Sequence, residues 1–405
     1  MEIICAKTKR DNSYAAGKHL GKQLAKISPE QTFLFSSVKY NFGELVRGIL
    51  AETDTLISGC SAAGAICGNK IIDDGAVATG FSSPHIKFGS GIGVGLNKNA
   101  GLAGSTAIKS ALTDLRRKKL TKIFAKYYAA VVHDPTQIIR QSPSFAALMF
   151  VDGLSGCEEA TLSGITKELN IPLPLIGGSA GDDLQLKQTL QICNNKIYKN
   201  STVLSILVTN YALGFAVGHG WRPRKKAVLV TKSKGRIVYE LDNRPAADVY
   251  AELLNLKRSE LLKEKQIAFK TGLQHPLAAI SMSGDYWLKH PKEVFEDGAI
   301  SFFSEVPQGV ALVATDGSPS TLMKEGVNTV QQALNKIGNA SAVFVVNCVA
   351  RRAFLGKKAE EEIEQISELT DAPIFGFYSY GEQSFTPTTP LCHRNQTISV
   401  LAIGK

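Results

Sequence analysis

The chain has 405 residues, and its 44% hydrophobic and 20% charged residues make an ordinary globular composition, which excludes a disordered or fibrous protein. The 46 lysines and arginines outnumber the 36 acidic residues, but no nucleic-acid-binding motif accompanies them, so we interpret the net charge of +10 as a solvated basic surface. The N-terminus lacks the apolar core of a signal peptide, and no run reaches the ~18 apolar residues of a membrane span. We therefore expect a soluble, cytoplasmic protein that contacts neither nucleic acid nor membrane.

The cysteines and histidines do not have the spacing of a metal site. The seven cysteines include no C-x-x-C pair, which is typical of reduced thiols in a cytoplasmic protein. The seven histidines include no H-E-x-x-H motif and no other closely spaced pair. A site with several histidine ligands is therefore not expected, whereas a single axial histidine for haem needs no motif.

The first predicted unit of the chain is a strand, a helix and a second strand. Thr32–Ser36 is an apolar run, Phe42–Glu52 has helical spacing, and Thr55–Ile57 is apolar again. The unit ends in a turn of small residues, Gly59–Gly64, and Ala76–Phe81 predicts a further strand after it.

A second unit of the same kind begins at residue 146. Ala146–Val151 predicts a strand, and the helix after it places Leu162, Ile165 and Leu169 on one face. The strand Leu173–Ile176 follows and ends in the turn Gly177–Gly181. After this turn, Leu190–Cys193 and Val203–Val208 read as two strands joined by a hairpin turn at residues 194–196.

A third unit completes the repeat. Ala342–Val346 predicts a strand, and the following helix carries Ile363, Ile366 and Leu369 on one face. The strand Pro373–Phe375 ends in the turn Gly376–Glu382, and residues 396–402 predict a last strand. In each unit the two strands should be parallel, with a right-handed crossover between them.

These units predict an α/β fold with two domains whose mixed sheets are parallel in the middle and antiparallel toward the edges. A chain of this length exceeds what one hydrophobic core usually serves. The glycine-rich segment 214–223 leads into a new strand at residues 227–231, and residues 236–245 read as a strand and a turn before a helix. We therefore expect one α/β domain over residues 1–222 and a second over residues 223–405.

The repeated turns are candidates for a ligand site, because open α/β sheets bind ligands beyond the C-terminal ends of their parallel strands. The alternative is that the glycines serve only to make tight turns. Arg352 would suit a carboxylate or propionate, unless one of the two adjacent arginines pairs with Glu382. The candidate ligand-binding residues are Gly59, Ser61, Gly178, Ser179, Asp182, Cys348, Arg351, Arg352, Tyr378, Tyr380, Gly381, Glu382 and His393.

An enzyme is the alternative to a binding protein. Cys348 ends a predicted strand and precedes a helix, where a thiolate would be favoured. His393 could act as its base, with Glu382 or Asn395 orienting the ring, in an acyl-transfer or hydrolase reaction. This alternative requires the sulfur to lie within hydrogen-bond reach of a nitrogen of His393. A buried structural cysteine at a strand end is the other interpretation.

Six short segments, taken in their order along the chain, resemble the FIST family, with an N-terminal and a C-terminal FIST domain in tandem. They include the first two turns, and the rest lie in the second half of the chain. The matching segments are residues 59–64, 177–183, 241–247, 347–352, 376–383 and 393–397.

The resemblance implies a sensory module that binds a small ligand and signals to a separate partner, a histidine kinase or a cyclic-di-GMP signalling protein. Proteins of this size in the family include the NosP group, which resembles haem-binding nitric oxide sensors that regulate a histidine kinase. Haem is therefore one expected cofactor, and an amino acid or another small molecule is the alternative ligand. A homodimer is compatible with the resemblance.

His219 is the first candidate for an axial haem ligand. It lies at the expected domain junction, with Phe215 and Trp221 as apolar walls and Arg222 and Arg224 as cations for the propionates. His393 is the second candidate. The alternative for His219 is a turn histidine that faces solvent.

Overall fold

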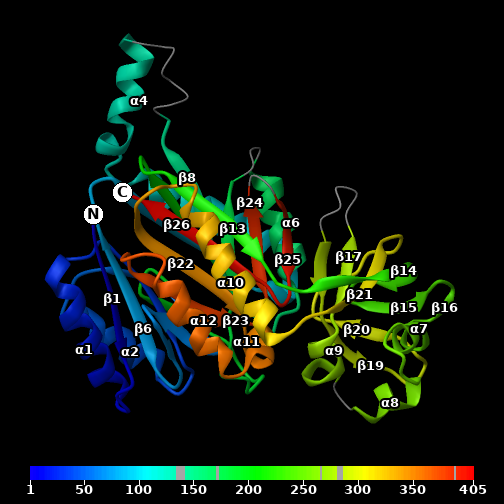
Figure 1. The fold of residues 1–405 in the computed structure, drawn as a ribbon. Helices are drawn as coiled ribbons and strands as arrows, with labels where there is room; N and C mark the ends of the chain where they lie inside the picture. Colours follow the sequence, from blue (N-terminus) through cyan, green and yellow to red (C-terminus); the bar gives the residue numbers. More distant parts are fainter. Residues whose placement is uncertain (134–141, 170–172, 265–266, 281–285, 387–388) are drawn as a thin grey trace.

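Three six-stranded sheets and one eight-stranded sheet carry the fold of the computed structural model, which describes residues 1–133, 142–169, 173–264, 267–280, 286–386 and 389–405 (Figure 1). Each six-stranded sheet contains one of the three predicted units. In the described part of the chain, no helix is both long and apolar enough to cross a membrane.

The first sheet contains the two parallel strands of the first unit. Its parallel pair lies between an antiparallel neighbour on one side and a short hairpin on the other. The strands, in order, are β1 (Glu2–Thr8), β6 (Ala76–Ser82), β2 (Gln31–Ser36), β3 (Leu56–Ser61), β10 (Gln191–Cys193) and β11 (Lys196–Tyr198). The helices are α1 (Ser13–Leu24) and α2 (Phe42–Leu50), and each is capped at its N-terminus by an asparagine side chain.

The second sheet repeats this arrangement. Its strands, in order, are β7 (Ile86–Val94), β12 (Ser201–Thr209), β8 (Ser144–Val151), β9 (Leu175–Ser179), β24 (Glu382–Thr386) and β25 (Thr389–Arg394). The helices α3 (Leu96–Arg116) and α6 (Glu158–Glu168) pack on its outer face, and α4 (Thr121–His133) projects from the body (Figure 1).

The third sheet has the same order again. Its strands are β13 (Leu213–Gly218), β26 (Ile398–Gly404), β22 (Ala340–Cys348), β23 (Ile374–Ser379), β4 (Ala65–Cys67) and β5 (Lys70–Ile72). Its helices are α10 (Pro319–Leu334), α11 (Val349–Leu355) and α12 (Lys358–Ser367). The α/β class, the parallel pairs within each unit and the position of the three turns at the ends of those pairs are all confirmed.

The three units exchange their hairpins in a cycle. The hairpin β4–β5 of the first unit joins the third sheet, β10–β11 of the second unit joins the first sheet, and β24–β25 of the third unit joins the second sheet. The turn at Asn194 and Asn195, both with positive φ, therefore joins β10 to β11. The expectation that it leads directly into residues 203–208 is wrong, because those residues return to the second sheet as β12.

The inner faces of the three sheets meet in one aromatic core. Strand alternation places Phe33 and Phe35 of β2 on the same inward face. The ring of Phe35 lies 4.7 Å from that of Phe377 in the third sheet and 5.5 Å from that of Phe150 in the second sheet. Because one cluster serves all three sheets, none of them can bury its inner face alone.

The fourth sheet interrupts the third unit between β13 and α10, and all of its strand pairs are antiparallel. It begins at the expected junction, but the residues after 222 also supply strands to the second and third sheets, so the division at residues 222 and 223 stays a prediction. The strands are β18 (Tyr286–Lys289), β17 (Leu277–Ile280), β21 (Ala311–Asp316), β14 (Arg222–Lys234), β15 (Ile237–Leu241), β20 (Ile300–Phe302) and β19 (Pro291–Val294), with β16 (Arg244–Pro245) on β15. The helices α7 (Ala246–Leu253), α8 (Arg258–Lys263) and α9 (Thr271–Gln274) belong to this region.

We expect Gly59→Ala to destabilise the protein far more than Gly68→Ala. Both glycines have positive φ, but an added Cβ at Gly59 would lie 2.0 Å from the carbonyl oxygen of Leu34, whereas Gly68 has open space around that position. The cost at Gly59 should reach ~3 kcal/mol, against ~1 kcal/mol at Gly68 from the backbone alone. Urea denaturation of the two variants measures the difference, and equal losses would contradict the close approach of β3 to β2.

Candidate functional site

The three turns meet at one place, where each hydrogen-bonds to the next. The N–H of Gly181 donates to the carbonyl of Ser61 at 3.1 Å, and the N–H of Ala63 donates to the carbonyl of Tyr378 at 3.1 Å. The N–H of Tyr380 closes the cycle by donating to the carbonyl of Ser179 at 3.0 Å. We call residues 61–64, 179–182 and 378–381 the turn hub. It is the point at which each chain segment crosses into the neighbouring sheet.

The serine hydroxyls of the hub are buried and engaged within the protein. Ser61 accepts the backbone N–H of Leu190 at 2.9 Å. Ser179 donates to Glu158 at 3.1 Å, and Ser379 donates to Glu382 at 2.6 Å. Gly59 and Gly178 lie inside strands that approach neighbouring atoms closely. These candidates from the sequence are therefore occupied by contacts that hold the hub together.

Asp182 and Tyr380 shape the loop that leaves the second turn. The Asp182 carboxylate accepts backbone N–H groups from residues 186, 187 and 188, and it accepts the Tyr380 hydroxyl at 2.5 Å. The same hydroxyl accepts the N–H of Leu184 at 2.8 Å. Both side chains thus act on the backbone of residues 182–188.

The adjacent arginines have different partners. Arg351 is fully buried and pairs with Glu362, which joins α11 to α12. Arg352 makes two 2.7 Å bonds to Asp73 and lies 4.9 Å from the ring centre of Tyr378. The alternative pairing of an arginine with Glu382 is wrong, because that carboxylate accepts from Thr397 and Ser379 instead.

A cavity of about 350 Å³ opens beside the hub, and we call it the hub cavity. Arg352 lines it together with three carboxylates. Burial, with the nearby charges of Asp74 and Asp182, raises the pKa of Asp183. The lining residues are Ala63, Asp73, Asp74, Asp183, Leu184, Val349, Arg352, Ala353 and Gly356.

Cys348 and His393 have separate environments. Burial, and then the charge of Glu382, raises the pKa of the Cys348 thiol, so the sulfur stays protonated at neutral pH. The ring nitrogen Nδ1 of His393 lies 3.0 Å from the amide nitrogen of Gln383, which is its donor. Within the described chain, no hydrogen bond joins the sulfur to His393. Asn395 accepts the backbone N–H of His290 and does not orient His393.

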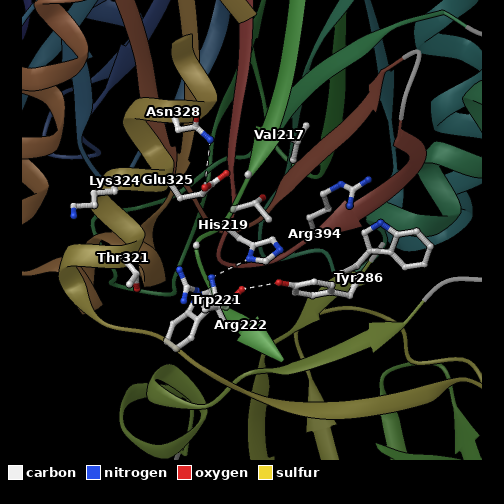
Figure 2. Close-up of a pocket in the computed structure, with 14 residues that line it drawn as sticks. Val217, His219, Trp221, Arg222, Tyr286, Thr321, Lys324, Glu325, Asn328 and Arg394 are labelled. Atoms are coloured by element: carbon white, nitrogen blue, oxygen red, sulfur yellow. Dashed lines mark hydrogen bonds between the residues drawn. The ribbon is translucent and has the colours of Figure 1, made fainter. Parts of the chain in front are cut away.

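A second, larger cavity of about 620 Å³ lies where the fourth sheet meets the third unit (Figure 2). We call it the junction cleft. Its walls come from the β13–β14 connection, β18, α10 and the end of β25. The lining residues are Val217, Gly218, His219, Gly220, Trp221, Arg222, Tyr286, Trp287, Thr321, Lys324, Glu325, Asn328, Arg394 and Thr397.

Glycine allows α10 to pack against the connection that carries His219. Gly220 has a φ of +84°, and an added Cβ there would lie 2.7 Å from the Cα of Leu322 on α10. The chain can therefore turn sharply beside the helix. This turn places the His219 side chain among the residues that line the cleft, as Figure 2 shows.

The His219 ring is neutral and has one defined tautomer. Burial, and then the charges of Arg394 and Arg351, lowers its pKa to about 4. Nδ1 accepts the backbone N–H of Trp221 at 3.0 Å, so the proton of the neutral ring is on Nε2. Tyr286 lies 5.0 Å away, measured between ring centres, and its hydroxyl donates to the Trp221 carbonyl at 2.8 Å. His219 therefore presents an N–H donor rather than a free lone pair.

Cations outnumber acids around the cleft. Arg222 and Lys324 are exposed, and neither forms an ion pair within the part of the chain that is described. Arg394 donates to the hydroxyl of Ser384 and lies over the ring of Trp287. Glu325 is the carboxylate of the lining set. Such a lining favours an anionic group on a ligand.

The residues foreseen around His219 lie in different places. Trp221 and Arg222 line the cleft, whereas Phe215 packs in the aromatic core and Arg224 pairs with Asp316. Sequence reasoning missed the walls from α10 and β18, which are far along the chain. A sequence signal existed for only two of the missed residues, Arg394 and Thr397, because both belong to the family-like segment 393–397. The missed residues are Tyr286, Trp287, Lys324, Glu325, Asn328, Arg394 and Thr397.

Metal-ligand clusters give no alternative site. Among the described residues, no group of three or more histidine, cysteine, aspartate or glutamate side chains is arranged to hold a metal ion.

Comparison with known proteins finds one curated relative and a remote structural match. The chain is 24% identical over 342 residues to the uncharacterized protein MJ1623 of Methanocaldococcus jannaschii, a match that covers 82% of this chain and 60% of the relative. The chain thus spans less than two thirds of that relative's length. A PurL structure from T. maritima complexed with AMPPCP covers 99% of this chain and 72% of its own, at 9% identity and a TM-score of 0.18, which is too low to relate the two folds.

Two family models cover most of the chain. The FIST N domain matches residues 31–244, and the FIST C domain matches residues 246–384. FIST domains are sensory domains of signal transduction that bind small ligands. The resemblance seen in the six sequence segments is confirmed, and this chain belongs to the FIST family.

Proposed function

We propose that this protein is a sensor that binds a small ligand with a carboxylate, an amino acid in the simplest case, in the junction cleft. The observation that carries the proposal is the neutral His219 ring, whose Nε2–H is a donor in a cleft that Arg222 and Lys324 also line. A carboxylate needs such donors and cations, and a guanidinium binds it with two parallel bonds.

The opposite charge of an amino acid also has a partner in the cleft. Glu325 of α10 lines the same cavity, and its carboxylate accepts the amide of Asn328 at 3.5 Å. The aromatic rings of Tyr286 and Trp287 supply apolar area for a side chain. The cleft thus combines charged and polar groups, which would orient a ligand, with aromatic area for its side chain.

The position of the cleft suits signalling. Its walls belong to two bodies of structure, the third unit and the inserted fourth sheet. A ligand that contacts both walls would favour the arrangement in which they lie close together. The partner proteins that we expect to respond to this change, a histidine kinase or a cyclic-di-GMP signalling protein, remain predictions.

Haem does not fit the residues of the cleft. An iron-bound histidine presents the lone pair of one ring nitrogen and donates a proton from the other. In His219 the nitrogen Nδ1 already accepts the Trp221 N–H, so Nε2 carries the proton and has no lone pair to offer. His393 has the same difficulty, because its Nδ1 accepts from Gln383. We therefore do not extend the proposal to haem or nitric oxide.

We expect Arg222→Ala and Lys324→Ala each to weaken amino-acid binding at least tenfold, because each removes a cation from the cleft. Glu325→Gln should weaken binding of amino acids but leave binding of the corresponding carboxylic acids without the amine unchanged. Isothermal titration calorimetry with the twenty amino acids and their amine-free analogues measures this.

Lys225→Ala is the matched control, since Lys225 lies on the same strand as Arg222 but does not line the cleft. Unchanged affinity in both cation variants, or no binding of any of these compounds, would remove the proposed ligand class.

We expect His219→Asn to reduce the loss of stability that the protein suffers on acidification. The pKa of His219 is about 4 in the folded protein and ~6.5 when unfolded, so the unfolded chain binds more protons between these values. Stability present above pH 6.5 is therefore lost as the pH falls toward 4. Asparagine keeps an acceptor near Trp221 but cannot titrate.

Urea denaturation at pH 7 and pH 4.5 measures this effect. His290, whose pKa burial also lowers to about 4, contributes a second loss that remains in the variant. His133→Asn, an exposed position, serves as the control. Parallel losses in the wild type and His219→Asn would contradict the neutral state of the half-buried ring.

For haem, we expect wild type and His219→Ala, each mixed with equimolar haem, to give the same absorption spectrum as one another. This should hold both in the absence and in the presence of nitric oxide. The physical reason is the occupied Nδ1 of His219. A Soret band that is present in wild type and lost in His219→Ala would overturn this assignment of the tautomer.

A further inference from the structure

Two leucines of the loop after β9 face solvent in an unfavourable backbone conformation. Leu184 is 50% exposed with a φ of 61°, and Leu186 is 53% exposed with a φ of 54°. Asp183 between the hub and these leucines also has a positive φ, of 54°. Leucine gains nothing from the left-handed region, where glycine and asparagine are the residues commonly found. Packing therefore does not explain these side chains.

Several hydrogen bonds hold this loop in place, although the left-handed backbone of its leucines is energetically unfavourable. The Asp182 carboxylate accepts three backbone N–H groups, and the Tyr380 hydroxyl accepts the N–H of Leu184. The Asp183 carboxylate accepts the Ser37 hydroxyl at 2.8 Å and the Val38 N–H at 2.9 Å. Strained backbone that is fixed by so many contacts is characteristic of functional surfaces.

The hub cavity lies directly beside the first of these leucines, since Leu184 is one of its lining residues. Its wall includes the small apolar side chains of Ala63, Val349 and Ala353. Three aspartates line it against one arginine, Arg352, which is paired with Asp73. The place is thus an acidic and apolar hollow on a chain whose net charge is +10.

We propose that Leu184, Leu186 and the hub cavity form a docking surface for a cationic amphipathic segment of another protein. The exposed leucines would contact the apolar face of that segment, and Asp74 and Asp183 would pair with a lysine or arginine beside it. Charge complementarity selects a cationic partner, because the aspartates of the hub cavity would repel an acidic segment. An acidic segment would bind instead to the basic surface elsewhere on this chain. The surface does not depend on which ligand the junction cleft binds.

A second copy of the chain is the competing occupant. The projecting helix α4 carries Lys122 and Lys126 and exposes Tyr128 and Val132. A contact between α4 of one copy and the hub cavity of the next would join two different surfaces, unlike the self-complementary interface of two-fold dimers, which are the commonest oligomers. We therefore assign the surface to another protein, and self-association becomes an outcome of the test.

The probe is a fluorescent synthetic helix with leucines on one face and lysines on the other, compared with a counterpart in which glutamate replaces lysine. Fluorescence anisotropy with the full-length protein should show binding of the lysine peptide, with the glutamate peptide at least tenfold weaker. Leu184→Asn/Leu186→Asn should weaken the lysine peptide at least tenfold. Asp74→Asn should weaken it as well, and asparagine tolerates the φ of 47° at that position.

Thermal unfolding separates docking from a structural role. Asparagine suits the left-handed backbone, so the double variant should melt at the wild-type temperature or above it while losing the peptide. Leu262→Asn, at a similarly exposed leucine of α8, should bind as wild type does.

Three results would overturn the proposal. The first is binding of the lysine peptide that is equal in wild type and in the double variant, and the second is no binding of either peptide. The third is wild-type self-association in sedimentation velocity that the double variant abolishes, because this would assign the surface to a second copy.

Discussion

The rest of the structure depends on the cyclic contact of the three turns. Each turn hydrogen-bonds to the next through its backbone, and the hairpin that follows each turn pairs with a strand of a neighbouring sheet. A hairpin that leaves its own unit cannot form its sheet until the neighbouring unit is in place. The three sheets also share one aromatic core. Units that look independent along the chain are therefore parts of one cooperative body, and the hub is where they are joined.

This closed body explains why the ligand-site candidates at the turns are mostly structural. Glycine, serine, Asp182 and Tyr380 are used to bring three backbones together and to satisfy their N–H groups. The open space lies instead beside the hub and at the junction with the inserted sheet. The rule that ligands bind at the ends of parallel strands locates the hub cavity, but the larger cleft arises from an insertion that the rule does not describe.

The two cavities have opposite chemistry. The junction cleft combines cations with a neutral histidine donor, whereas the hub cavity is acidic and flanked by exposed leucines. In the proposed function, the junction cleft holds the ligand and the hub cavity holds the partner, and the third unit connects the two. α10 and α11, which border the cleft and the hub cavity respectively, are linked because Arg351 of α11 donates to the Leu322 carbonyl of α10.

The sequence by itself determined the local elements of this protein. Apolar periodicity predicted the three strand–helix–strand units, and the glycine-rich turns marked the ends of their parallel strands, because both signals arise from neighbouring residues. Family membership followed from short motifs for the same reason. Only the tertiary structure decided which sheet each hairpin joins, since edge strands of similar composition can pair with any unit. It also decided the walls of the cleft, because Lys324, Tyr286 and His219 come together only when the fourth sheet and α10 pack on the β13–β14 connection. The tautomer of His219, on which the proposed ligand class rests, depends on one backbone N–H that no spacing of residues reveals.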